Sequence, residues 1–176
     1  GVLSPGAHSD VIDYVTISHT GNAVDFGDLT TSKIGNPSGI ANQIRGFCVG
    51  GERGSPAQNV DVIEYVTIAS SGMNALDFGD LTYTAQGESG GGSSTRGILA
   101  GGFSPTMYNN INYFTLATLG NAREFGDLEV AKRSASKGQS SNPIRWVMIG
   151  GMTPSYVSTM DYITIATLGN STNFGD

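Results

Sequence analysis

The chain has 176 residues and a net charge of −6, and its 38% hydrophobic content is enough to build the core of one ordinary domain. No basic patch is visible, which argues against nucleic-acid binding, and the single cysteine, Cys48, excludes an intrachain disulfide. Every apolar run is far shorter than the ~20 residues of a membrane-spanning helix, and no signal peptide is recognisable.

The chain is a tandem repeat with a period of about 50 residues. We divide it into a partial unit and three full units that form one repeat domain: 1–29, 30–81, 82–128 and 129–176. The partial unit supplies only a strand containing "VIDYVTI" and a strand containing "VDFGDLT". Both motifs return in each later unit, the second as "LDFGDLT", "REFGDLE" and "TNFGD".

Each full unit is predicted to form four strands, and the unit 82–128 shows the pattern. A weak first strand is expected at 83–87, followed by a Gly/Ser-rich turn over 87–95. The second strand is "RGILAGG", the third contains "INYFTLA", and the fourth contains "REFGDL". No apolar period of 3.6 residues appears, so almost no helix is expected.

The Tyr-containing third strand is apolar on both faces. In "VIDYVTI", Ile12 and Tyr14 share one face, whereas Val11, Val15 and Ile17 share the other. A strand of this kind is buried on both faces, which predicts sheets stacked face to face. The Gly-Gly pair that ends each second strand is predicted to allow positive φ and close packing.

An apolar strand ending in Gly-Gly, a loop, a strand with Tyr and a strand with a large aromatic residue together resemble the kelch repeat. The resemblance covers nearly the whole chain, although Phe stands where kelch units usually carry Trp. It implies an all-β fold, a kelch-like β-propeller segment of four-stranded antiparallel blades, with about 3.5 blades in this chain. It also implies that the loops joining strands two and three share one face with the connections between blades, and that this face binds partners.

The amino-acid sequence of the repeat also resembles kelch-like repeats in structural and tail proteins of marine bacteriophages. This resemblance implies a non-enzymatic structural protein in a virion or tail fibre, whose partners are other protein subunits or a host receptor or glycan. A kelch-type lectin or adhesin outside a virion is the alternative. A galactose-oxidase-type enzyme scaffold is a distant one, because the chain shows no matching Tyr/His/Cys set. We expect a virion or extracellular location, no cofactor and no insertion into a membrane.

Closed propellers usually need at least four blades. The chain starts inside one motif and stops inside another, so we expect an excerpt of a longer propeller. The alternative is that two copies close one ring.

Four acids recur once per unit, and three arginines open the second strands. Catalytic pairs or metal ligands must converge, whereas one acid per blade lies apart from the next. We therefore interpret these residues as structural and expect Arg–Asp contacts within or between blades. The residues concerned are Asp28, Asp80, Asp127, Asp176, Arg45, Arg96 and Arg145.

No metal or nucleophilic site is predicted. His8 and His19 lie in different loops without ligand spacing, and Cys48 takes the place of a buried apolar residue. The segment "GESGGGSST" is not a phosphate-binding loop, because no Lys and no helix follow it.

Loops that differ between units are the predicted binding positions, since variable loops on a rigid scaffold often carry function. The alternative is that they are ordinary solvated loops. The candidate residues in the loops after Gly-Gly are Arg53, Met107, Tyr108 and Tyr156, and those in the connections between units are Lys33, Tyr83, Lys132 and Arg133.

Overall fold

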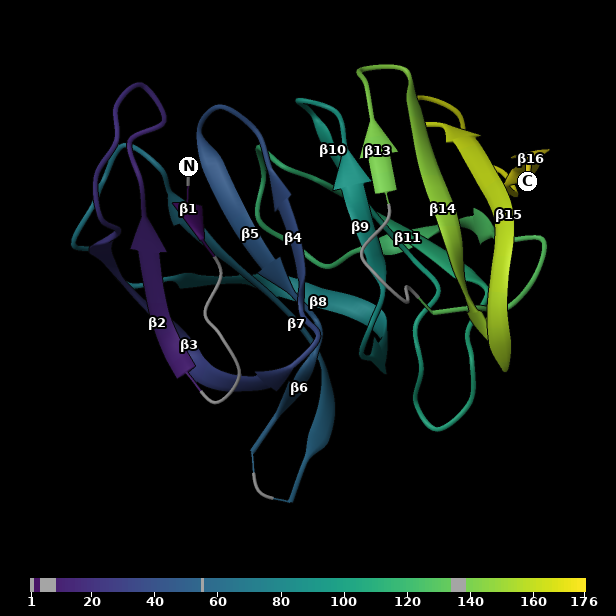
Figure 1. The fold of residues 1–176 in the computed structure, drawn as a ribbon, viewed down its shortest axis with the longest axis horizontal. Helices are drawn as coiled ribbons and strands as arrows, with labels where there is room; N and C mark the ends of the chain where they lie inside the picture. The colour runs from purple at the N-terminus through teal and green to yellow at the C-terminus, as the bar shows by residue number, and fades with distance from the viewer. Residues whose placement is uncertain (1, 4–8, 55, 134–138) are drawn as a thin grey trace.

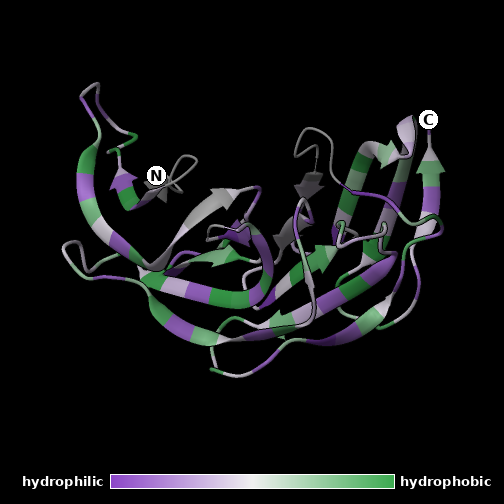
Figure 2. Cartoon of the chain, turned by 90° about the horizontal axis from the view of Figure 1, so that it is seen from below, coloured by the Kyte–Doolittle hydropathy of each residue, from purple (hydrophilic) through white to green (hydrophobic). Residues whose placement is uncertain are grey.

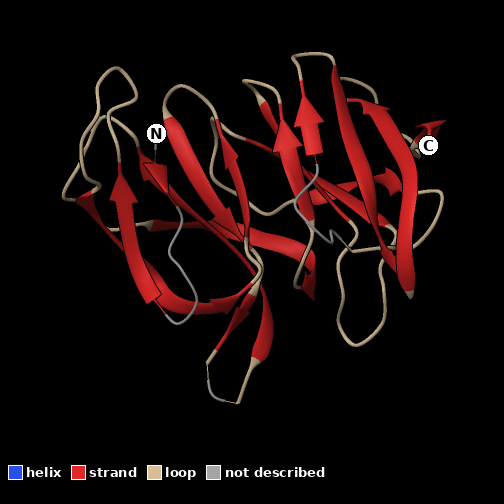
Figure 3. Ribbon diagram, viewed as in Figure 1, coloured by secondary structure: helices blue, strands red, loops and turns tan. Residues whose placement is uncertain are grey.

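The computed structural model describes residues 2–3, 9–54, 56–133 and 139–176. Over these residues the chain forms sixteen strands and no helix (Figure 3). The prediction of an all-β fold is therefore confirmed.

The first eight strands are hydrogen-bonded into one antiparallel sheet, and two four-stranded antiparallel sheets follow. Because only the short strand β6 joins its two halves, we describe the eight-stranded sheet as an N-terminal sheet and a second, four-stranded sheet. The N-terminal strands are β1 (Val2–Leu3), β2 (Ser9–Tyr14) and β3 (Val24–Gly35). The second sheet contains β4 (Ser38–Ala41), β5 (Arg45–Val49), β7 (Gln58–Thr67) and β8 (Leu76–Ala85). The third contains β9 (Ser89–Gly92), β10 (Arg96–Ala100), β11 (Asn110–Thr115) and β12 (Arg123–Asp127). The fourth contains β13 (Gln139–Ser141), β14 (Arg145–Thr153), β15 (Ser155–Thr164) and β16 (Thr172–Gly175).

The sheets follow one another along an open arc, with the N-terminal strands at one end and the C-terminal strands at the other (Figures 1 and 2). Each sheet is a meander in which neighbouring strands are consecutive in the sequence, except that the two-residue strand β6 (Glu52–Arg53) bridges β3 and β7. The first strands of successive full sheets contact each other, β4 against β9 and β9 against β13. These short strands therefore form the inner side of the arrangement.

The predicted position of the first strand in the unit 82–128 is wrong. Tyr83 extends the preceding fourth strand, and the segment Ser89–Gly92, predicted as a turn, forms the inner strand β9. Glycine is needed there because a Cβ on Gly90 would lie 3.1 Å from the Cβ of Ser38, and one on Gly91 only 2.5 Å from the ring of Trp146. The inner strand is thus glycine-rich because its neighbours on both sides approach it closely.

Each of the three apolar cores lies between two consecutive sheets. The core between the second and third sheets joins Phe47, Ile63 and Phe78 to Phe114 and Leu116. The aromatic rings meet edge to face, with the centroids of Phe78 and Phe114 5.4 Å apart. The cores on either side of it are built in the same way. In β7 and β11 the two-sided apolar pattern therefore has its predicted cause, burial between stacked sheets. In the N-terminal copy the prediction is wrong for one face, because Val11 and Ile17 are exposed.

The repeated Phe-Gly-Asp motif forms a β-bulge. In the second sheet, Ile63 pairs with Gly79 and Glu64 pairs with Asp77, so Phe78 is the extra residue and turns into the core. The pairing of third and fourth strands shifts at the corresponding position in the other sheets. Gly79 has φ +149°, which disfavours any residue with a Cβ.

The bulge also receives the turn of the following sheet. A Cβ on Gly79 would lie 2.6 Å from the carbonyl oxygen of Gly120, so glycine permits the approach. The N–H of Gly120 donates to Phe78 O at 2.9 Å, and Asp80 N–H donates to Asn121 Oδ1 at 3.1 Å. Corresponding bonds join the first sheet to the second and the third to the fourth. The bond made by the repeated Asp is therefore a bond of its main-chain amide to an Asn of the next unit.

The predicted Arg–Asp contacts are wrong, because the arginines stack on the tyrosines of their own third strands. The guanidinium carbon of Arg96 lies 5.0 Å from the ring centroid of Tyr113, and its Nη1 donates to Ile165 O of the next sheet at 2.8 Å. Arg45 and Arg145 stack on the equivalent tyrosines. Within the described ranges, no ion pair joins these arginines to the repeated aspartates. A planar guanidinium can stack on an aromatic ring and donate to a carbonyl oxygen at the same time, so the arginine needs no acidic partner.

Candidate binding face

The loops after Gly-Gly and the connections between sheets lie on one edge of the arc, the lower edge in Figure 1. Arg53 lies in β6 on this edge, where its main chain pairs with Gln58, and its side chain is half-buried. The side chain of Lys33 is outside the part of the structure that can be described.

Tyr156 is the most exposed of the predicted binding residues whose side chains the structure describes. Its side chain is 80% exposed near the start of β15, in the hairpin that follows Gly150-Gly151. Met107 and Tyr108 are only half-buried, and the Tyr108 hydroxyl donates to Ser104 O at 2.8 Å within its own loop. These three residues still lie on the edge where the repeat places its variable loops.

Tyr83, predicted in a connection between units, lies in strand β8 instead, and its half-buried side chain is held by its neighbours. Its hydroxyl lies 2.9 Å from Gly101 O and 3.3 Å from Asn110 O, and its ring centroid is 4.8 Å from that of Tyr108. Burial, followed by the nearby Glu88 and Tyr108, raises the pKa of Tyr83 far above its ordinary value. The phenol therefore stays neutral and holds the start of the loop after β10.

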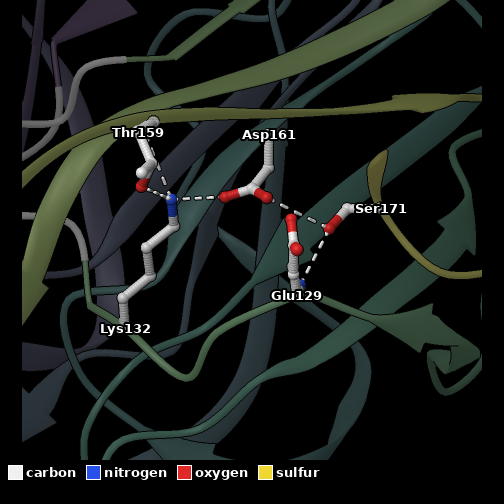
Figure 4. A network of polar contacts seen from close by, with 5 residues as sticks. All are labelled: Glu129, Lys132, Thr159, Asp161 and Ser171. Atoms are coloured by element: carbon white, nitrogen blue, oxygen red, sulfur yellow. Dashed lines mark hydrogen bonds and ion pairs between the residues drawn. The ribbon is translucent and has the colours of Figure 1, made fainter. Parts of the chain in front are cut away.

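Lys132 is also wrongly predicted as a surface residue. Its side chain is 1% exposed and forms an ion pair with Asp161 of the next sheet (Figure 4). The Nζ atom also donates to Thr159 O at 3.3 Å. A buried charge of this kind is held only where it is paired and hydrogen-bonded, so the pair joins the third and fourth sheets.

The Asp161 carboxylate belongs to a small polar network. Ser171 Oγ lies 3.4 Å from Asp161 Oδ1 and accepts a 3.1 Å hydrogen bond from the Glu129 amide (Figure 4). Beside the network an open groove of about 590 Å³ runs along the junction of the two sheets, lined by Asp127 and Asn170 among others. Its lining is mostly polar.

The residue at the position of Asp161 contacts the preceding sheet in every full unit. The Thr30 amide donates to Glu64 Oε1 at 2.8 Å, and the Thr82 amide donates to Asn112 Oδ1 at 2.9 Å. In the second and third sheets this acceptor therefore bonds the fourth strand of the preceding sheet, whereas in the fourth sheet Ser171 accepts from the corresponding Glu129 amide and Asp161 pairs with Lys132.

A sequence signal for the buried lysine exists but was missed. Lysine occurs seven residues after Phe26 and Phe125, ahead of units with an acid before the Tyr. Alanine, as Ala85, precedes the unit whose acceptor is the neutral Asn112. A lysine therefore occurs where the next unit has an acid, and a neutral residue occurs where it has Asn, which predicts contact between these two positions of neighbouring units.

The edge opposite the variable loops carries exposed apolar side chains that the sequence reasoning also missed. They lie in the turns between first and second strands and between third and fourth strands: Ile44, Met73, Leu119, Ile144 and Leu168. Exposed apolar side chains that recur from unit to unit on one edge are typical of a contact surface.

No group of three or more His, Cys, Asp or Glu side chains that could hold a metal ion is found among the described residues. His8 lies outside them, His19 is exposed, and Cys48 is buried as predicted for an apolar position. The repeated acids lie one on each fourth strand or at its end. In the same part of the chain, no helix could span a membrane.

No protein-family model matches this chain, and no curated protein is similar to it in sequence.

Proposed function

We propose that the chain is a non-enzymatic, kelch-type β-propeller segment that serves as a binding scaffold in a larger assembly. The observation that carries the proposal is the stack of similar sheets, each joined to the next by the same hydrogen bonds between bulge and turn. Such a scaffold holds its loops rigidly and leaves them free to vary. The edge with Tyr156, Met107 and Tyr108 is the proposed binding face.

The assembly we favour is a phage virion or tail fibre, in which this edge meets a host glycan, a host receptor or another virion protein. The resemblance of the repeat sequence to repeats of phage structural proteins supports this choice. The exposed ring of Tyr156 suits stacking on a sugar or packing in a protein groove.

A glycan array and a panel of bacterial surface preparations would test the binding face. We expect Tyr156→Ala to weaken any specific binding by about tenfold or more, as for a contact worth at least about 1.4 kcal/mol. Leu168→Ala, an exposed apolar change on the opposite edge, is the matched control and should leave this binding unchanged. Equal binding by both variants and the wild type would refute the assignment of the face.

The second candidate is a lectin or adhesin outside a virion, favoured by the same exposed tyrosine. Binding to a defined glycan without association with other virion proteins would support it over the first. Uniform binding to all sugars would count against both glycan versions.

A further inference from the structure

The edge of the arc opposite the variable loops, the upper edge in Figure 1, carries no formal charge. It is formed by the turns between first and second strands and between third and fourth strands: 15–23, 42–44, 68–75, 93–95, 116–122, 142–144 and 165–171. The chain has nine Lys and Arg and fifteen Asp and Glu residues, and none of them lies in these turns. Charged side chains ordinarily gather on exposed segments of this kind, so their absence sets this uncharged edge apart from the rest of the surface.

The uncharged edge also exposes large apolar side chains. Between 58% and 65% of each of the following is exposed: Ile44, Met73, Leu119, Ile144 and Leu168. The two kinds of turn lie side by side, because Ile68 N–H donates to Ile44 O at 2.8 Å. The turns of the second and third sheets belong to sheets that have an apolar core on both faces, so their exposure does not depend on a missing neighbour in the arc. Recurrent exposed apolar side chains of this kind are typical of a contact surface.

The charges of the chain lie elsewhere on the surface. The connections on the opposite edge include Glu52, Arg53 and Glu129. Next to the uncharged edge, Arg45 and Arg96 are turned onto tyrosine rings and donate to carbonyl oxygens of the next sheet. Because the whole chain has a net charge of −6, two copies repel each other where charged surfaces meet. The uncharged edge brings no like charges together, so two copies can approach each other closely there.

The shape of the uncharged edge also fits a second copy. The sheets follow one another along an arc, so the turns recur at regular intervals along a curved line (Figure 2). A two-fold axis perpendicular to the axis of the arc places this line on an identical one with the same period and the same curvature. The fit depends on the period and not on the number of units, so it holds for an array of any length.

We propose that the uncharged edge is a self-association surface, on which a second copy of this chain docks edge to edge about a two-fold axis. The contact is isologous, because the same turns face each other from both copies. The two arcs are stacked on one another and do not complete a single ring. The two variable-loop edges then point away from each other and stay open. The inference goes beyond the proposed function, which the binding assay with Tyr156→Ala tests independently.

Sedimentation velocity over a series of concentrations tests the proposal with a matched pair of variants. Leu119→Glu places a charge on the uncharged edge, whereas Val130→Glu places the same charge in the connection after β12. The two side chains are 60% and 52% exposed, so circular dichroism and melting curves of both variants should match those of the wild type. The wild type and Val130→Glu should dimerise with the same affinity. Leu119→Glu should dimerise at least about tenfold more weakly, because each dimer would then bury two unpaired carboxylates.

Met73→Glu should weaken the dimer in the same way as Leu119→Glu, because it changes the same edge in another unit. Rising salt should strengthen the dimer, since salt screens the repulsion between two copies of the same net charge. A wild type that sediments as a monomer at every concentration would overturn the proposal, as would equal affinities of the wild type, Leu119→Glu and Val130→Glu. A dimer that salt weakens would show that opposite charges meet, and would also overturn it. Flotation of the wild type, but not of Leu119→Glu, with phosphatidylcholine vesicles would assign the edge to a lipid surface instead and overturn the proposal.

Discussion

Replacing Gly79 with alanine tests whether the Phe-Gly-Asp motif exists for contact between sheets. The added Cβ would lie 2.6 Å from both the carbonyl carbon and oxygen of Gly120, which are main-chain atoms and cannot rotate away. Ordinary contacts of this kind exceed about 3.4 Å, so the second and third sheets would have to part by several tenths of an ångström. The packing of Phe78 on Phe114 would loosen as a result.

Gly120→Ala is the matched control. Gly120 has φ +142° and Gly79 has φ +149°, so both substitutions strain the backbone by a similar amount, about 1–3 kcal/mol. A Cβ on Gly120 meets nothing within 4 Å. Gly79→Ala should therefore destabilise the fold by about 1–3 kcal/mol more than the control, the usual range for overpacking.

Urea unfolding measures the difference, followed by circular dichroism and by the fluorescence of Trp146, which is fully buried between the third and fourth sheets. The midpoint of Gly79→Ala should lie clearly below that of Gly120→Ala, with similar slopes. Equal midpoints would refute the reasoning, because strain at φ alone would then explain the glycine.

Three further changes give separate tests by thermal or urea unfolding. Arg96→Ala removes the stacking on Tyr113 and the bond to Ile165 O, and should lower stability by about 2 kcal/mol. Arg145→Ala removes the stacking on Tyr162 and, within the described ranges, no bond to a neighbouring sheet, so it should lower stability less. Lys132→Met leaves the Asp161 carboxylate buried without its cation and should lower stability by about 3–5 kcal/mol. The double variant Lys132→Met/Asp161→Met should recover most of this loss. Equal losses in the single and double variants would contradict a role for the charge. Burial, then Asp61 and Asp77, raises the pKa of Asp80 in the folded chain, so its ionised form opposes folding and stability should fall as pH rises through the carboxyl range. Asp80→Asn should therefore melt above the wild type at pH 7, and the difference should vanish below the ordinary pKa of 3.8; a constant difference across that range would exclude the electrostatic cause.

The repeat made much of the architecture predictable. The motifs around Tyr65 and Phe78 placed the third and fourth strands, and the two apolar faces of the third strand correctly indicated stacking. The inner strand β9 was missed because propensity disfavours a run of glycines in a strand. Glycine is required in this strand because the neighbouring sheets approach it closely, and this approach is visible only in the folded structure.

The site was harder to predict, because a residue's place in the sequence does not tell which way its side chain turns. Tyr83 and Lys132 follow the bulge motif in apparent connections, yet one is fixed by main-chain carbonyls and the other by an acid of the next unit. The arginines were predicted to contact acids on the basis of charge alone. Arg96 instead stacks on Tyr113, which lies on the paired strand two residues from Thr115, the residue opposite Arg96. Partners in adjacent units become visible only when positions are compared across one full period.

The location of the apolar cores between sheets gives the molecule the energetics of a one-dimensional array. A sheet alone has little core of its own, so its stability comes from coupling to its nearest neighbours. The second and third sheets have an apolar core on both faces, so their amide hydrogens should exchange most slowly. Adding or removing a whole unit should therefore change the free energy of unfolding by a nearly constant increment per junction.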